Sequence, residues 1–208
     1  MSIIPHSFFF RHAIALQEVK NIPHKKGRLL KLPAACALPD LSFQEGAAKW
    51  GTVRLAWNSK GLGISLKVDS KQHLTTPAET FQVWIDTRDT KNIHRANRYC
   101  HLFQFQACGN TRKQPLCTQM TINRAQSDAP FCELSQIRLW SDLKAKGYEL
   151  EAWLPAETLN GYDPAAYPQL GFYYKIFDSE LGEQFMTINQ EFPIRQDPSL
   201  WSTMRLDS

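Results

Sequence analysis

The feature that most constrains this chain is an alternation of apolar and polar side chains with a period of two residues, repeated in many short segments. In TVRLAW (52–57) the residues Val53, Leu55 and Trp57 fall on one face, and LGISLKVD (62–69) resumes the alternation after a turn at 58–61. A period of two is that of a strand with one buried face, and a short turn with Asn and Gly joins antiparallel neighbours. Residues 52–69 are therefore predicted to form a β-hairpin.

The same pattern continues toward the end of the chain, without the alternation of strands and long helices that marks a parallel sheet. Pro155 is expected to open one short helix that ends near Gly161. These patterns predict an all-β fold, an antiparallel β-sandwich of the jelly-roll type with one or two short helices. Further strands are expected at 28–32, around Trp84, and at 98–106, 135–142, 147–155, 169–178 and 201–206. The expected core residues are Val53, Leu55, Ile64, Leu66, Val83, Ile85, Phe103, Phe105, Leu150 and Phe172.

The length of 208 residues suits a single β-sandwich domain, which we place at 28–208. Residues 1–27 show no clean period and are expected to be an irregular lead-in that wraps the domain or is partly loose. The apolar cluster at 8–10 is followed at once by Arg11 and His12, and no basic stretch precedes it. A secretory signal is therefore not evident. We expect a cytoplasmic protein, unless a leader was removed from the sequence.

Charge and cysteine content exclude several classes of function. The net charge is only +4, and the densest basic run, between Lys20 and Lys31, is expected to be a solvated segment rather than a nucleic-acid surface. No apolar run approaches the ~18 residues of a membrane span. The five cysteines are odd in number, widely spaced and lack a CxxC pair, which predicts reduced thiols and no structural metal. No cofactor is expected.

Five stretches of the sequence occur in the order VRLAWNSKGLGISLKV (53–68), FQVWIDTRD (81–89), GYELEAWLP (147–155), LGFYYKIFDSE (170–180) and DPSLWSTMRL (197–206). They resemble the carbohydrate-binding-module family 9 (CBM9) and DOMON-like β-sandwich domains. The resemblance covers about residues 28–206 and implies an antiparallel sandwich that binds sugars in some members and other ligands, including haem, in relatives. It also implies a saccharide held between two aromatic rings, of which only Trp84 has a candidate position here, whereas the Asp- and Asn-rich calcium loops have no clear counterpart.

The segment around Trp84 supplies the candidate ligand surface. A sugar site needs a flat apolar surface for the ring and short polar arms for the hydroxyl groups. On a strand with a period of two, Trp84 shares a face with polar residues, and a neighbouring strand is expected to add two more. The predicted ligand-binding residues are Trp84, Gln82, Asp86, Arg88, Arg98 and Gln104.

The alternative is that Trp84 packs beneath a loop such as 107–133, and that Arg88 pairs with Asp86 or Asp89. Trp140 and Trp153 have the same ambiguity, because each alternates onto the polar side of its strand.

A metal or haem site has weaker support. A metal cluster of His94, His101, Cys100 and Asp86 is less favoured than a hydrogen-bonded core histidine at His101. Met120, Met186 and His101 are candidate axial ligands for a haem, and none of them is specific.

Three classes of function therefore compete. The favoured class is a non-catalytic carbohydrate-binding module with a saccharide ligand. The second is a scaffold or protein-interaction domain with a protein partner, and a covered Trp84 ring would favour it. The third is a glycan-processing enzyme that would use Glu149 and Glu151, two positions apart on one strand. Enzymatic activity is the less favoured class, because no nucleophile or metal-protease motif is present.

Overall fold

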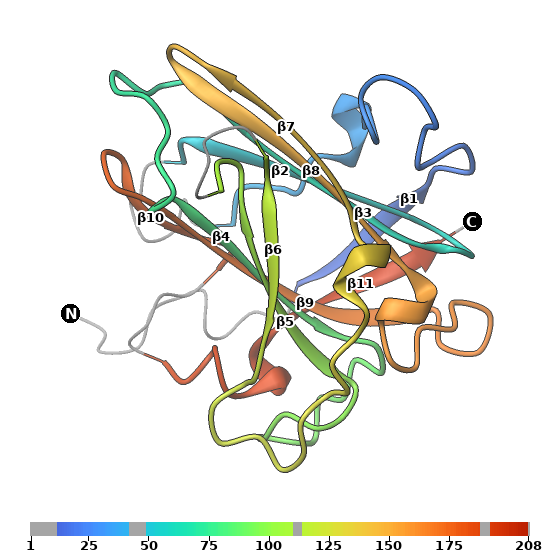
Figure 1. Ribbon diagram of the computed structural model, residues 1–208. Coiled ribbons are helices and arrows are strands. Elements are labelled where there is room, and N and C mark those ends of the chain that lie inside the picture. Colours follow the sequence, from blue (N-terminus) through green and yellow to red (C-terminus); the bar gives the residue numbers. More distant parts are fainter. Residues whose placement is uncertain (1–11, 42–48, 110–113, 188–191, 208) are drawn as a thin grey trace.

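The computed structural model describes residues 12–41, 49–109, 114–187 and 192–207, and in this part of the chain the fold is all-β (Figure 1). Its helices are short 3-10 turns, and none of those in the described ranges is long and apolar enough to cross a membrane. The predicted fold class is confirmed. The strands are β1 (Ala13–Glu18), β2 (Gly51–Asn58), β3 (Gly61–Val68), β4 (Thr80–Asp86), β5 (Cys100–Gln106), β6 (Leu116–Met120), β7 (Arg138–Lys144), β8 (Gly147–Pro155), β9 (Gln169–Asp178), β10 (Gly182–Phe185) and β11 (Ser202–Asp207). The 3-10 turns are η2 (Ala34–Cys36), η4 (Leu134–Gln136), η5 (Ala156–Thr158) and η6 (Pro198–Leu200).

The strands form one path of hydrogen-bonded neighbours in the order β6-β5-β4-β9-β11-β1-β2-β3-β8-β7, and β10 pairs with β9. All pairings are antiparallel except those of β1, which runs parallel to both β11 and β2. The path folds back on itself, so that β4, β5 and β9 face β2, β3 and β8 across the core. Gly51 on β2 shows this contact, because a Cβ at that position would lie 3.0 Å from the Ile176 side chain on β9.

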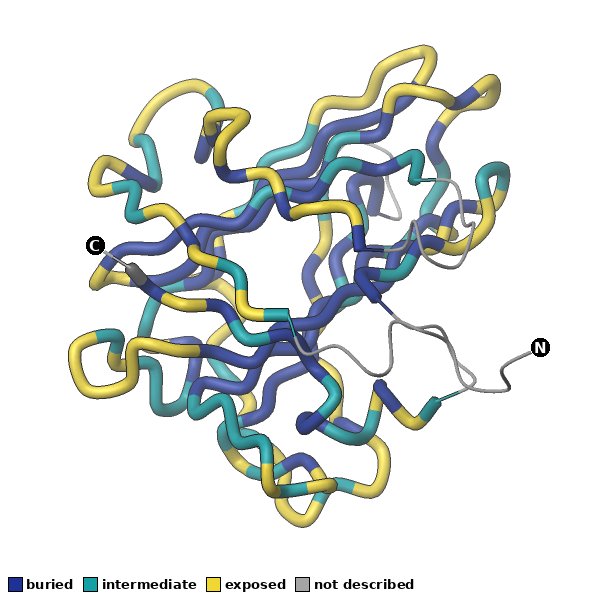
Figure 2. Tube along the Cα trace, turned by 180° about the vertical axis from the view of Figure 1, so that it is seen from behind, coloured by how far each residue is buried: buried dark blue, intermediate teal, exposed yellow. Residues whose placement is uncertain are grey.

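The core lies between these two layers and consists mainly of the apolar residues of the alternating strands. Val53, Leu55, Val83, Ile85 and Phe103 have no measurable exposure. Phe105 and Phe172 are equally buried, and Ile64, Leu66 and Leu150 are at most 2% exposed. The predicted core is therefore confirmed in full. In Figure 2 the strands are dark blue along most of their length, while the connecting loops carry most of the exposed residues.

A second apolar cluster lies on the outer face of β2, β3 and β8. The segment 19–36 crosses this face, and Ile22, Leu29 and Leu30 pack with Ala56 and Trp153. Trp153 is 4% exposed, and Trp140 packs at the edge of the same cluster. The ambiguity about these two tryptophans is therefore decided in favour of packing, because the N-terminal segment covers the face on which they stand.

Several details differ from the sequence-based expectation. Residues 28–32 are not a strand: Lys31 has a φ of +47°, and Leu29, Leu30 and Leu32 dock on the sheet as a bent segment. Part of the expected lead-in, Ala13–Glu18, is β1, because its backbone completes the gap between β11 and β2. Strands β6 and β10 were not predicted, since each is short and lies in a stretch of mixed polarity. The expected short helix after Pro155 is the single 3-10 turn η5.

A buried ion cluster fixes one end of the sandwich. Lys71 Nζ lies 2.6 Å from Asp178 Oδ2 and 3.0 Å from Glu79 Oε1, and all three residues are at most 2% exposed. Burial by itself would lower the pKa of Lys71, but hydrogen bonds to the two carboxylates outweigh burial and raise it. The cluster therefore ties the segment between β3 and β4 to the end of β9.

Candidate functional site: a pocket on the outer face of β4 and β5

The candidate site begins with a row of side chains on the face of β4, β5 and β9 that points away from the core. Trp84 lies opposite Leu102 on β5 and Tyr173 on β9, and Gln82 lies opposite Gln104. Because side chains alternate across a sheet, these residues share one face while Val83 and Ile85 occupy the other. The Gln82 amide nitrogen donates to the Gln104 carbonyl oxygen at 2.9 Å, which leaves an ordered polar surface beside the aromatic row.

Two loops rise beside this row and turn it into a pocket of about 270 Å³. One loop follows β6 and is anchored by buried Ile122, whose carbonyl accepts from the Ala125 amide. The other precedes η6 and is anchored by buried Ile194, whose carbonyl accepts from Trp201 Nε1 at 2.6 Å. The lining residues are Gln82, Trp84, Leu102, Met120, Thr121, Ile122, Asn123, Arg195 and Gln196.

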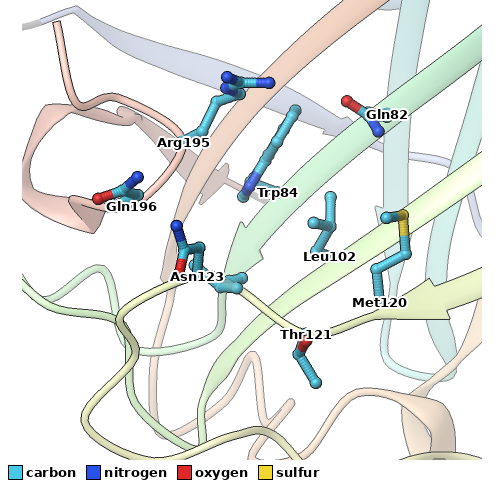
Figure 3. Close-up of a pocket in the computed structure, with 9 residues that line it drawn as sticks. Gln82, Trp84, Leu102, Met120, Thr121, Asn123, Arg195 and Gln196 are labelled. Atoms are coloured by element: carbon cyan, nitrogen blue, oxygen red, sulfur yellow. The ribbon is translucent and has the colours of Figure 1, made fainter.

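Figure 3 shows how the lining side chains lie around Trp84. Arg195, Gln196 and Asn123 lie on one side of the indole, while Gln82 and Met120 lie on the other. Trp84 and Leu102 form an apolar floor and are at most 6% exposed. Asn123 and Arg195 stand on the rim and are exposed. An apolar floor with a few polar groups on its rim is the usual construction of a small-molecule site.

Trp84 is not the solvent-facing platform that a stacking site would require. It is 2% exposed, and its ring packs on Tyr173 with 5.4 Å between ring centroids. Residues 120–123, which belong to the loop region suspected from the sequence, lie against it. The ring therefore contributes only a small part of its surface to the pocket floor. Its Nε1 has no hydrogen-bond partner among the described residues, and this end of the indole lies toward Asn123 in Figure 3.

Asp86 does not reach the pocket. It is fully buried at the end of β4, where its carboxylate accepts hydrogen bonds from the Arg88 amide at 2.9 Å and the Thr90 amide at 2.7 Å. Burial raises the pKa of Asp86, and these two backbone hydrogen bonds oppose the shift. Asp86 therefore shapes the turn that follows β4, and it does not line the pocket formed around Trp84.

Arg88 and Arg98 belong to a separate surface cluster. The Arg88 guanidinium lies 3.6 Å from the Tyr167 ring centroid and 4.5 Å from that of Tyr99, and it donates to the Gly161 carbonyl. Arg98 donates to the Tyr99 hydroxyl at 2.9 Å. The expected Arg88 ion pair with Asp86 or Asp89 is wrong. Arg88 donates to Asp86 through its backbone amide and not through its guanidinium, and Asp89 pairs with Lys91 at 2.7 Å.

The structure thus unites Trp84 and Gln82 in one pocket, with Gln104 bonded to its wall, and places the other three predicted residues elsewhere. Sequence reasoning missed Asn123, Arg195 and Gln196, because they stand in loops whose proximity to β4 depends on the tertiary fold. The buried apolar residues beside them, Ile122 and Ile194, are the only local signal that these loops are anchored to the domain.

Glu149 and Glu151 do not form an open catalytic pair. Both are buried on β8, and Arg28 Nη2 lies 2.7 Å from Glu149 Oε2 and 2.8 Å from Glu151 Oε1. The Leu30 amide also donates to Glu151 Oε2 at 2.8 Å. The two carboxylates are therefore not available to a substrate, and the expectation that the basic run containing Arg28 is merely solvated is wrong for Arg28. The pair holds the N-terminal segment onto the sheet.

His101 is a core residue, as the sequence indicated, and its ring stacks on Phe103 with 6.0 Å between centroids. Burial lowers the pKa of His101 to about 4, although the nearby Asn160 backbone opposes this shift. The expected hydrogen bond is not present, since neither ring nitrogen has a partner of good geometry in the described ranges. None of the five cysteines forms a disulfide bond, and burial raises the pKa of Cys100 to about 12.

Comparison with solved structures finds proteins with a similar fold. A CBM9 module from Caldicellulosiruptor kristjanssonii in complex with glucose is similar with a TM-score of 0.63 and 11% identity, over 94% of this chain and 95% of that chain. The complex of such a module with cellotriose gives a TM-score of 0.60 and 13% identity, over 93% and 92% of the two chains. The chain has a CBM9-like fold. A Bacteroides uniformis protein is similar with a TM-score of 0.51 and 11% identity, over 94% of this chain and 99% of that one.

The comparisons of sequence found no counterpart to this structural similarity. No protein-family model matches the sequence, and no curated protein matches it either. The expected CBM9 resemblance is confirmed for the fold, while the DOMON resemblance stays a prediction.

Proposed function

We propose that this chain is a non-catalytic carbohydrate-binding module and that its saccharide binds in the pocket floored by Trp84 and Leu102. The observation that carries the proposal is the combination, on one CBM9-like sheet face, of an apolar floor with a rim of amide and guanidinium groups. Apolar surface suits the C–H face of a sugar ring, and amide groups both donate to and accept from its hydroxyls. The related modules solved with glucose and cellotriose support the ligand class.

In this pocket Leu102 and the exposed Met120 provide the apolar contact, and Trp84 supports them from below. Asn123 and Gln196 provide the polar contacts on the rim, and Gln82 is held by Gln104 so that its orientation is fixed. A pocket with a pre-oriented polar group loses less conformational entropy on binding.

The test is a glycan array followed by calorimetry with glucose and cellotriose, on wild type and on Asn123→Ala/Gln196→Ala. The double variant removes rim hydrogen-bonding groups and is expected to weaken binding at least tenfold, at about 1 kcal/mol for each lost hydrogen bond. Gln72→Ala, an exposed glutamine that does not line the pocket, is the matched control and should bind like wild type. Retention of wild-type affinity by the double variant would place the sugar elsewhere.

A protein-interaction scaffold is the second candidate, and the covered ring of Trp84 is the observation that favours it. This candidate predicts that wild type binds no glycan on the array while the protein remains folded. Binding of a defined saccharide that the rim variant loses would exclude it as the sole function.

A further inference from the structure

A second hollow of about 300 Å³ lies beside the pocket floored by Trp84, and basic side chains line it. The two hollows share Gln196, and Arg95 and Arg124 stand on the second, next to the Asn123 of the first. Arg195 stands on the first, beside Gln196. The second hollow is lined by His94, Arg95, Arg124, Pro193, Gln196 and Asp197.

The basic groups are available to a ligand. Arg95, Arg124 and Arg195 are exposed, and within the described part of the chain no carboxylate lies within ion-pair distance of their guanidinium groups. Among the described residues that line the two hollows, the carboxylate is that of Asp197, and it already contacts His94 Nδ1 at 3.0 Å and the Ser199 amide at 2.9 Å. The guanidinium groups of Arg95 and Arg124 therefore line one hollow, in which the carboxylate of Asp197 already has partners.

Two of these arginines are also held in place. Arg95 Nε donates to the Arg124 carbonyl at 2.9 Å, and the Gln126 amide donates to the Ala96 carbonyl at 2.7 Å. These bonds join the loop between β4 and β5 to the loop after β6. Arg124 has a φ of +59°, a left-handed conformation that is uncommon for a residue other than glycine. The rim is thus built by contacts between two separate loops.

Resting on the proposed function, we propose that the ligand is an acidic saccharide, whose sugar ring lies over Leu102 and whose anionic group lies at Arg95 and Arg124 in the second hollow. The anionic group is a carboxylate of a uronic acid or a sulfate ester. The carboxylate is planar and the sulfate ester is tetrahedral, and guanidinium groups bind both kinds of oxyanion with charge-assisted hydrogen bonds.

The test compares ligands that differ only in the anionic group: cellobiose, cellobiouronic acid, the methyl ester of that acid, and cellobiose 6′-sulfate. Wild type is expected to bind at least one of the two anionic sugars about tenfold more tightly than cellobiose or the ester. This preference should shrink as salt is raised, because ions screen exposed charges. Whichever anionic sugar is preferred identifies the group.

Arg95→Gln and Arg124→Gln, which line the second hollow and not the sugar pocket, are each expected to reduce the preference for the anionic sugar several-fold and to leave cellobiose binding nearly unchanged. Arg138→Gln is the matched control, since it removes the same charge from exposed Arg138 on β7 and should retain the full preference. Equal binding of cellobiose and both anionic sugars would overturn this inference while leaving the proposed function intact. Binding of none of the sugars would overturn both, and tight binding of inorganic sulfate with no contribution from the sugar would overturn the saccharide class.

Discussion

At the residue scale, Trp84 shows that a tryptophan on the polar face of a strand is not thereby exposed. Gln82 and Asp86 flank it in the alternation, yet the ring packs against Tyr173 and beneath the loop that follows β6. Asp86 is polar for a local reason, because its carboxylate accepts two backbone hydrogen bonds at the end of β4. The polarity of a residue on a strand face therefore reflects that residue's own hydrogen-bond partners and does not predict whether the next side chain on the same face is exposed.

Replacing Trp84 by alanine is expected to destabilise the protein by about 3–5 kcal/mol, because it removes a large buried ring and leaves a cavity. Trp84→Phe should cost distinctly less, since most of the packing on Tyr173 is kept. Urea unfolding followed by circular dichroism measures both variants. A Trp84→Ala variant as stable as wild type would show that the ring is a free platform after all.

His101 is expected to make the stability of the fold depend on pH between about 6.5 and 4. The unfolded chain takes up a proton at His101 near pH 6.5, whereas in the folded chain burial holds the pKa near 4. Stability is therefore fully present above pH 6.5 and is lost as pH falls through this window, by about 3 kcal/mol in total.

His101→Phe keeps a ring against Phe103 and removes the titration. The difference in unfolding free energy between pH 7 and pH 4 should then shrink by about 3 kcal/mol. Other acidic groups still titrate in the variant, so the comparison is with wild type at each pH. An unchanged difference would mean that His101 is protonated equally easily in both states.

At the scale of elements, the N-terminal segment 19–36 behaves as part of the sandwich, although it contains no strand. Leu29 and Leu30 fill the outer face of β3 and β8, and Glu151 accepts from the amides of Leu30 and Lys31. A buried carboxylate that receives backbone donors and Arg28 replaces the hydrogen bonds that a strand partner would supply. This explains why the segment is ordered despite having no period.

Glu151→Ala is expected to loosen this segment, since it leaves the two amides and Arg28 without their shared acceptor. Trypsin should then cleave after Lys25 or Lys26 several times faster than in wild type. Glu157→Ala, which removes an exposed glutamate just beyond β8, is the control and should be cleaved like wild type. Equal cleavage rates for all three proteins would show that apolar packing alone holds the segment.

At the scale of the whole molecule, the sequence by itself determined the fold class, most strands and the core, because alternation with a period of two is a local record of which face is buried. Strands β8 and β9 begin and end at the predicted residues. It also indicated that His101 lies on the apolar side.

Only the tertiary structure decided which residues meet at the candidate site. Trp84 from β4, Asn123 from the loop after β6 and Arg195 from the loop before η6 are distant in the chain, and no local pattern encodes their contact. The same holds for β1, which lies between β11 and β2 and pairs in parallel with both. It holds also for Glu151, which is buried because Arg28 and the segment around it, far away in the sequence, pack over it. Alternation shows which side chains point away from the core. Which segments then cover those side chains depends on packing between distant parts of the chain, and the local sequence pattern does not encode that packing.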